Sequence, residues 1–193
     1  MTEKPKPARS GRPQLMLVAL VFIVPMAAAL LLYFGSDALR PGGTSNHGAL
    51  LAPIVNLRDA LPGSEFGESI DGYWALIYRN TGACGEDCRG ALYKLRQSRL
   101  MLGNEMNRVE RVFLHGTSAP DRVFLDSEHG GMTTLHAPDE AALLESVRPG
   151  DQPDGGYYLL DPLGNIVMYF PPGIVPRDMV DDVSHLLDLS RIG

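Results

Sequence analysis

Residues Tyr73–Cys88 read YWALIYRNTGACGEDC, and this stretch predicts the centre of the fold. Its first six residues, Tyr73–Tyr78, are almost entirely apolar, and the run is closed by Asn, Thr and Gly at positions 80–82. A short apolar run that ends in turn-forming residues is typical of a strand buried on both faces. From Cys88 to Met101, apolar residues alternate with Arg and Lys at the spacing of an amphipathic helix. The chain's only two cysteines, Cys84 and Cys88, therefore lie where a buried strand meets a helix.

This position favours a functional role for the cysteine pair. The start of a helix presents unpaired N–H groups and the positive end of its dipole, which makes a thiolate easier to form. Residues four apart share one helical face, so both sulfurs are expected to meet one ligand or each other. Two acidic residues between the cysteines, Glu86 and Asp87, oppose the thiolate, and Arg79 and Arg89 are expected to offset them.

A structural disulfide is the alternative role for Cys84 and Cys88. By the loop-entropy relation, a disulfide that closes so short a loop stabilises the fold by only about 2 kcal/mol. The placement at a strand–helix joint instead favours redox chemistry or metal binding. Both interpretations are compatible with i, i+4 spacing.

An N-terminal membrane anchor is predicted at residues 15–34, a run of 20 residues without a charge. The expected organisation is a cytoplasmic stub at 1–14, this anchor, a linker at 35–48 and one domain at 49–193. The stub is basic and only Arg40 follows closely, so the positive-inside rule leaves the N-terminus in the cytoplasm. A cleaved signal peptide is the competing interpretation, but its apolar core is usually about 7–15 residues long. In a bacterium, either case exports the domain to the periplasm, where cysteines can be oxidised.

The charge of the exported part limits its partners. Of the chain's 17 basic and 23 acidic residues, four basic and one acidic lie in residues 1–34, which leaves 13 basic against 22 acidic. This negative balance argues against nucleic acid as a partner. It permits a basic protein surface or a metal cation.

The order of predicted elements gives the fold class. An apolar edge segment at 49–60 precedes the central strand and its helix, which is expected to run to about residue 107. A second strand follows at 109–115, a strand or connection at 121–126, a helix at 138–147, a hairpin at 157–161 and 165–170, and a last helix at 176–189. We therefore predict an α/β, thioredoxin-like domain with a central mixed sheet flanked by helices, preceded by one N-terminal transmembrane helix.

The buried strand, the Cys-x-x-x-Cys motif of Cys84 and Cys88, and the YLLDPLGN hairpin at 158–165 resemble the SCO/SenC family. These are membrane-anchored thioredoxin-fold proteins that help deliver copper to cytochrome c oxidase. The resemblance implies an inner-membrane assembly factor with a periplasmic domain. It also implies Cu(I) as the metal held by Cys84 and Cys88, and as partners an oxidase subunit or copper-site assembly proteins. A thiol–disulfide oxidoreductase is the implied enzyme class.

Two positions depart from the family pattern. Arg89 follows the motif where the family has proline, and no histidine lies between Arg148 and Tyr158, where the family has its third copper ligand. The resemblance therefore carries over to the cysteines and not to the histidine. Four residues elsewhere are candidate third ligands: His115, His129, Met132 and His136.

These departures favour thiol–disulfide exchange at Cys84 and Cys88 over stable copper binding. Cys84, on the more exposed N-terminal side, is the expected attacking residue. The alternative from another class is a non-catalytic scaffold of the respiratory oxidase, in which the disulfide is permanent.

Overall fold

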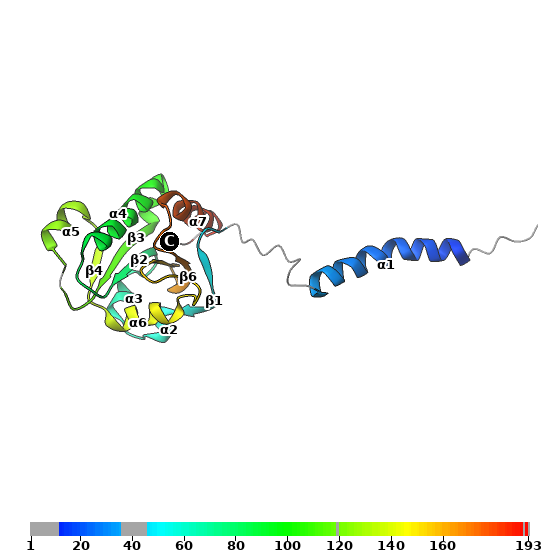
Figure 1. Ribbon diagram of the computed structural model, residues 1–193, viewed down its shortest axis with the longest axis horizontal. Coiled ribbons are helices and arrows are strands. Elements are labelled where there is room, and N and C mark those ends of the chain that lie inside the picture. The colour runs from blue at the N-terminus through cyan, green and yellow to red at the C-terminus, as the bar shows by residue number, and fades with distance from the viewer. Residues whose placement is uncertain (1–11, 36–45, 119, 191, 193) are drawn as a thin grey trace, which may run out of the picture. The chain divides into compact units, whose positions relative to one another are not determined.

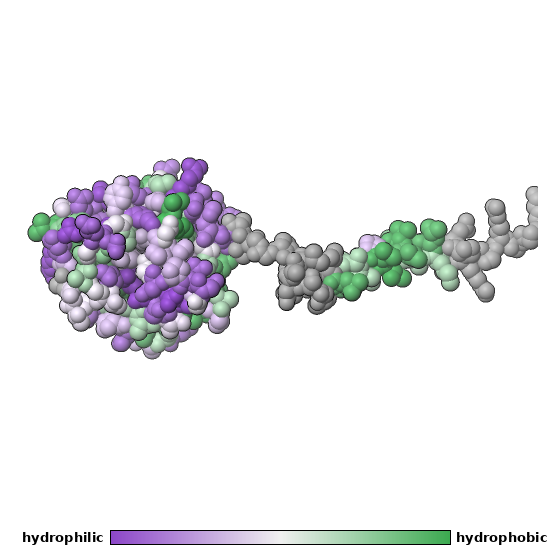
Figure 2. All heavy atoms as spheres, in the orientation of Figure 1, coloured by the Kyte–Doolittle hydropathy of each residue, from purple (hydrophilic) through white to green (hydrophobic). Residues whose placement is uncertain are grey.

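The computed structural model describes residues 12–35, 46–118, 120–190 and 192, and it divides the chain into two units at Ser45 and Asn46. The described part of the first unit is one helix, α1 (Arg12–Gly35), which includes Pro25 and the whole predicted anchor. Figure 2 shows hydrophobic side chains along the face of α1 in view, and its described large apolar side chains are exposed. Among the described residues, no helix combines the length and the hydropathy that crossing a membrane requires. The anchor and the four-part organisation stay predictions.

The second unit is built on one six-stranded mixed sheet with the order β1-β6-β5-β2-β3-β4. The predicted central strand β2 is parallel to β3, and β3 is parallel to β4. On its other side β2 is antiparallel to β5, which forms the predicted hairpin with β6, and β6 is antiparallel to β1 at the edge. The strands are β1 (Ala49–Asn56), β2 (Trp74–Asn80), β3 (Val109–His115), β4 (Thr133–Leu135), β5 (Tyr157–Leu160) and β6 (Asn165–Phe170).

Helices cover both faces of the sheet (Figure 1), and a separate apolar core lies between the sheet and the helices on each face. Helices α4 (Glu86–Met101) and α7 (Pro176–Leu189) pack on one face. The short helices α2 (Leu57–Ala60) and α3 (Glu65–Ser69) and helix α6 (Pro138–Val147) pack on the other. The first six residues of β2 are buried, and the side chains of the first five, residues 74–78, enter the two cores alternately. The prediction of a doubly buried central strand is therefore confirmed.

Three predicted segments differ from the structure. The segment at 121–126 is neither a strand nor a simple connection, because Asp121 accepts a hydrogen bond from the Phe124 N–H and starts helix α5 (Arg122–Glu128). The cysteine helix ends at Met101, and a 3-10 helix follows (Gly103–Arg108). The segment at 49–60 is an edge strand as predicted only through Asn56, whose side chain accepts from two N–H groups and starts α2.

Candidate functional site

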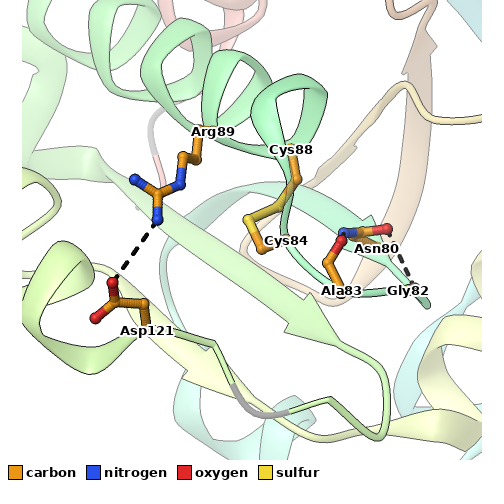
Figure 3. Close-up of a disulfide and its surroundings, with 7 residues drawn as sticks. All are labelled: Asn80, Gly82, Ala83, Cys84, Cys88, Arg89 and Asp121. Atoms are coloured by element: carbon orange, nitrogen blue, oxygen red, sulfur yellow. Dashed lines mark hydrogen bonds and ion pairs between the residues drawn. A yellow bond between two sulfur atoms is a disulfide. The ribbon is translucent and has the colours of Figure 1, made fainter.

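The cysteine pair lies beyond the carboxyl end of β2, where the connecting loop passes into the first turn of α4 (Figure 3). Cys84 and Cys88 are joined by a disulfide, and their Cα atoms are 5.1 Å apart. The expectation that both occupy one helical face is wrong, because Gly85 is the N-cap and keeps an extended backbone. Only Cys88 belongs to the helix, and Cys84 approaches it from the loop.

The two sulfurs lie in different environments. Cys88 is 4 % exposed and belongs to the apolar core between the sheet and α4. Cys84 is partly buried and packs against the edge of the same core. An incoming disulfide can therefore reach Cys84 more easily than Cys88.

Asn80 shapes the loop that carries Cys84. Its side chain accepts a hydrogen bond from the Gly82 N–H at 3.3 Å and donates one to the Ala83 carbonyl at 3.4 Å. The backbone carbonyl oxygen of Asn80 accepts a hydrogen bond from the Gly116 N–H at 2.8 Å. Gly116 packs so closely on Thr81 that an added Cβ would lie 2.6 Å from the Thr81 carbonyl carbon. The loop after β2 is thus fixed both by its own turn and by the loop after β3.

The start of α4 leaves its first N–H groups without a side-chain cap, since the N-cap residue is Gly85. These groups and the dipole stabilise negative charge at the position of Cys84. Glu86 and Asp87 occupy the same first turn and oppose that effect. The Asp87 carboxylate also acts on Tyr78 in the neighbouring strand β2. Burial is the main cause that raises the pKa of the Tyr78 hydroxyl, and the negative charge of Asp87 raises it further.

The two arginines that were expected to offset these carboxylates have other partners. Arg89 extends to one side of the disulfide, where its Nη2 lies 3.7 Å from Asp121 Oδ2 (Figure 3). Its guanidinium also lies 4.4 Å from the centre of the Phe124 ring. Arg79 is 8 % exposed and forms ion pairs with Glu145 and Asp154 on the opposite face of β2. The helix start is therefore the local feature that favours a Cys84 thiolate.

The candidate third-ligand histidines, all of them described residues, do not form a three-residue group with the cysteines. Among His, Cys, Asp and Glu of the described residues, only His47, Asp178 and Asp181 place three ligand atoms within 4.8 Å of one another. His129 is 4 % exposed, and burial and the nearby Arg111 lower the pKa of its imidazole. Met132 is partly buried and packs against the same apolar core as Cys84.

Two features of the site were missed in the sequence. A cavity of about 570 Å³ opens beside the first turn of α4, between Glu86 and Asp87 on one side and Asp154 on the other. Lys94 lines its wall, where burial lowers the pKa of the amine. The second missed feature is the buried ion pairing of Arg79. A charged residue within the apolar strand β2 indicates such a pair, but the partners Glu145 and Asp154 lie 66 and 75 residues away in sequence and could not be identified.

Residues 74–190 match the family described as transmembrane-like, thioredoxin-like, C-terminal domain, and this match covers more than half of the chain. No curated protein matches the sequence. The solved structures that are similar to this chain include three Sco-type proteins. Apo Sco1 from Thermus thermophilus is 15 % identical with a TM-score of 0.53, over 76 % of this chain and 99 % of that chain.

Arabidopsis thaliana ScoI with copper bound is 18 % identical with a TM-score of 0.51, over 64 % of this chain and 89 % of that chain. Yeast Sco1 with copper bound is 18 % identical with a TM-score of 0.50, over 63 % of this chain and 79 % of that chain. At these identities the likeness shows the fold. The predicted mixed sheet flanked by helices in a thioredoxin-like arrangement is confirmed.

Proposed function

Because the chain belongs to the transmembrane-like, thioredoxin-like, C-terminal domain family, we propose that Cys84 and Cys88 carry out thiol–disulfide exchange with a partner protein. The observation that carries this proposal is the asymmetry of the pair. Cys84 is partly exposed and precedes an uncapped helix start, whereas Cys88 is buried behind it. An exchanging pair needs one reachable attacking thiolate and one protected resolving thiol.

The exchange proceeds in two steps and moves two electrons to the partner. The Cys84 thiolate attacks one sulfur of the partner disulfide, which forms a mixed disulfide and releases the other partner sulfur as a thiolate. The Cys88 thiolate then attacks the Cys84 sulfur, which releases the second partner thiolate and forms the Cys84–Cys88 disulfide. A thiol reductant returns this disulfide to the dithiol.

The proposed setting is maturation of the copper site of cytochrome c oxidase at a bacterial inner membrane. The SCO/SenC-like cysteine motif and hairpin in the sequence support this setting, and so does the thioredoxin-like fold. Residues 15–34 would hold the domain at the periplasmic surface as a single-pass anchor. The partner would be the oxidase subunit, or an assembly protein, that carries the copper-site cysteines.

Cu(I) as cargo is the second form of this proposal. Two thiolates suit Cu(I), and the copper-bound Sco structures support the idea through their shared fold. In the oxidised chain, however, no described His, Asp or Glu completes a three-atom group with the cysteines. Exchange therefore has better support than stable copper storage.

A trapping experiment with single cysteine variants tests the exchange. The reduced full chain in mild detergent is mixed with glutathione disulfide, and the adducts are measured by mass spectrometry. Cys88→Ser should accumulate a mixed disulfide at Cys84, because its resolving thiol is missing. Cys84→Ser should form an adduct much more slowly, because its remaining thiol is buried. Equal rates for the two variants would contradict the assigned roles.

Two further measurements separate the alternatives. Cu(I) titration of the reduced chain against a competing chelator should show no tight 1:1 complex that depends on Cys84 if exchange is the function. Tight binding that Cys84→Ser abolishes would make the chain a copper carrier. In the host cell, Cys84→Ser should prevent assembly of the oxidase copper site, whereas a scaffold with a permanent disulfide would tolerate the substitution.

A further inference from the structure

Two carboxylates beside the cysteine pair have no cationic partner in the described part of the chain. Glu86 and Asp87 lie between the cysteines in the first turn of α4, and both residues are exposed. Among the described residues neither of them forms an ion pair, whereas Asp154 is paired with Arg79. Arg89, the first basic residue of α4, is directed to the start of α5 instead. The negative charge of the first turn is therefore left open to a partner.

The position of these two carboxylates has a cost for thiol–disulfide exchange. The thiolate is the attacking species, and a negative charge close to a thiol disfavours the thiolate form. Glu86 follows Cys84 by two residues, so the two Cα atoms lie no more than about 7 Å apart. A cation bound at Glu86 and Asp87 would remove this cost at the moment when the partner docks.

The cavity of about 570 Å³ lies on the side of α4 that carries these carboxylates. Its α4 wall includes positions 87, 90, 91 and 94, at the i, i+3, i+4 and i+7 spacing of one helical face. Asp154 and Tyr78 also line it. Burial is the main cause that raises the pKa of Tyr78, and the negative charges of Asp87 and Asp154 raise it further. The two carboxylates therefore act on the same part of the cavity wall.

Aromatic rings complete a wall that suits a cation. Tyr78 and Tyr157 both line the cavity, and their ring centroids are 5.6 Å apart. The face of an aromatic ring attracts a cation within about 6 Å of its centre. The protein's own Lys94 uses this attraction, with Nζ 5.9 Å from the centre of the Tyr157 ring and a 2.6 Å hydrogen bond to the Pro172 carbonyl.

Lys94 does not balance the carboxylates at the start of the helix. It follows Asp87 by seven residues and Glu86 by eight, which is about 10–12 Å along the helix axis. Charges at this separation are largely screened in water at physiological ionic strength. The cavity therefore has an acidic end next to the cysteines and a basic end away from them.

Resting on the exchange proposed above, we propose that the acidic end of this cavity receives a lysine or arginine side chain of the partner protein, from a residue close to the partner's disulfide. An extended chain advances about 3.3–3.6 Å per residue, so a residue one or two positions from the partner cysteine stays near the first turn of α4. The negative balance of the exported part, with 13 basic against 22 acidic residues, suits the same kind of partner. The cavity thus selects partners by charge and promotes exchange by neutralising Glu86 and Asp87.

Two peptide disulfides test this proposal. One is the symmetric disulfide of a peptide with a lysine two residues to each side of its cysteine, and the other has serines in place of the lysines. The reduced full chain with Cys88→Ser, in mild detergent, is mixed with each peptide, and mass spectrometry gives the rate of the mixed disulfide at Cys84. The ratio of the two rates, lysine over serine, cancels differences in the reactivity of the Cys84 thiol. Adding Glu86→Gln and Asp87→Asn should lower this ratio by about threefold to tenfold at low salt, because two exposed ion pairs are lost.

Asp59→Asn with Glu65→Gln is the matched control, because it removes the same two charges from α2 and α3 on the other face of the sheet. It should change the ratio by less than about twofold, since distant exposed charges are screened. Circular dichroism checks that each variant is folded. The proposal is overturned if the ratio does not depend on Glu86 and Asp87, or if the control lowers it equally; exchange itself then still stands. If neither peptide forms an adduct at Cys84, exchange is refuted and this proposal with it.

Discussion

Replacing Gly116 with alanine should loosen the loop that positions Cys84. The added Cβ would lie 2.6 Å from the Thr81 carbonyl carbon and 2.9 Å from Thr81 Cα. Non-bonded carbons prefer about 3.5 Å or more, so one of the two loops must move by about 1 Å. The movement strains or breaks the hydrogen bond from the Gly116 N–H to the Asn80 carbonyl. Gly116 has no positive φ, so the contact with Thr81, and not the backbone conformation, causes the effect.

The expected cost in free energy of unfolding is about 2 to 4 kcal/mol. Overpacking of a closely packed site typically costs about 1–3 kcal/mol. A lost backbone hydrogen bond adds about 1 kcal/mol. Denaturant unfolding followed by fluorescence measures the sum, because Trp74 is the chain's only tryptophan and is 5 % exposed.

Gly82→Ala is the matched control, because it changes the same loop. Its added Cβ would meet only the Asn80 side chain, at 3.9 Å, and the free energy of unfolding should change by less than about 0.5 kcal/mol. If Gly116→Ala and Gly82→Ala have the same unfolding midpoint, the loops do not depend on their close approach, and the account of how Cys84 is positioned is wrong.

Three further substitutions test the fold and its charges. Gly90→Ala in α4 should raise the free energy of unfolding by about 0.4–1 kcal/mol, since the new methyl group meets no atom within 4 Å; a loss of stability would contradict this. Leu92→Ala, at a fully buried position, should cost about 2–5 kcal/mol, whereas Tyr93→Ala on the exposed side should cost far less; denaturant midpoints compare them. Burial raises the pKa of Tyr158 from 10.0 to about 12, so between these pH values the unfolded chain loses a proton that the folded chain keeps. Stability should therefore fall more steeply over this pH window than in Tyr158→Phe, and equal slopes would refute it.

The main elements were predictable because their signals are local. The apolar run after Tyr73 identifies the central strand, and Pro at positions 138 and 176 marks the start of two helices. Helix α5 was missed because its signal is a single capping residue, Asp121, before a short apolar run that also fits a strand. Strand β4 has three residues, too few for any periodicity to appear.

The site was predictable only in part. The sequence identified Cys84 and Cys88 and predicted that Cys84 is the more exposed of the two, but it placed both on one helical face, whereas Cys84 lies in the loop before the helix. The start of the helix is set by the extended backbone of Gly85, which the i, i+4 spacing does not reveal. His115 and His136 appeared as unrelated candidates, because their proximity follows from the register of β3 and β4 across 21 residues of chain.

The midpoint potential of the Cys84–Cys88 disulfide tests the central claim most directly. It is measured on the full chain in thiol buffers of defined potential, with the fraction of free thiol as the readout. Thiol–disulfide exchange predicts a potential above about −300 mV, because the reduced Cys84 is stabilised at the start of α4 and stays reachable. A potential well below that value would make the disulfide structural and would leave the scaffold as the function of the domain.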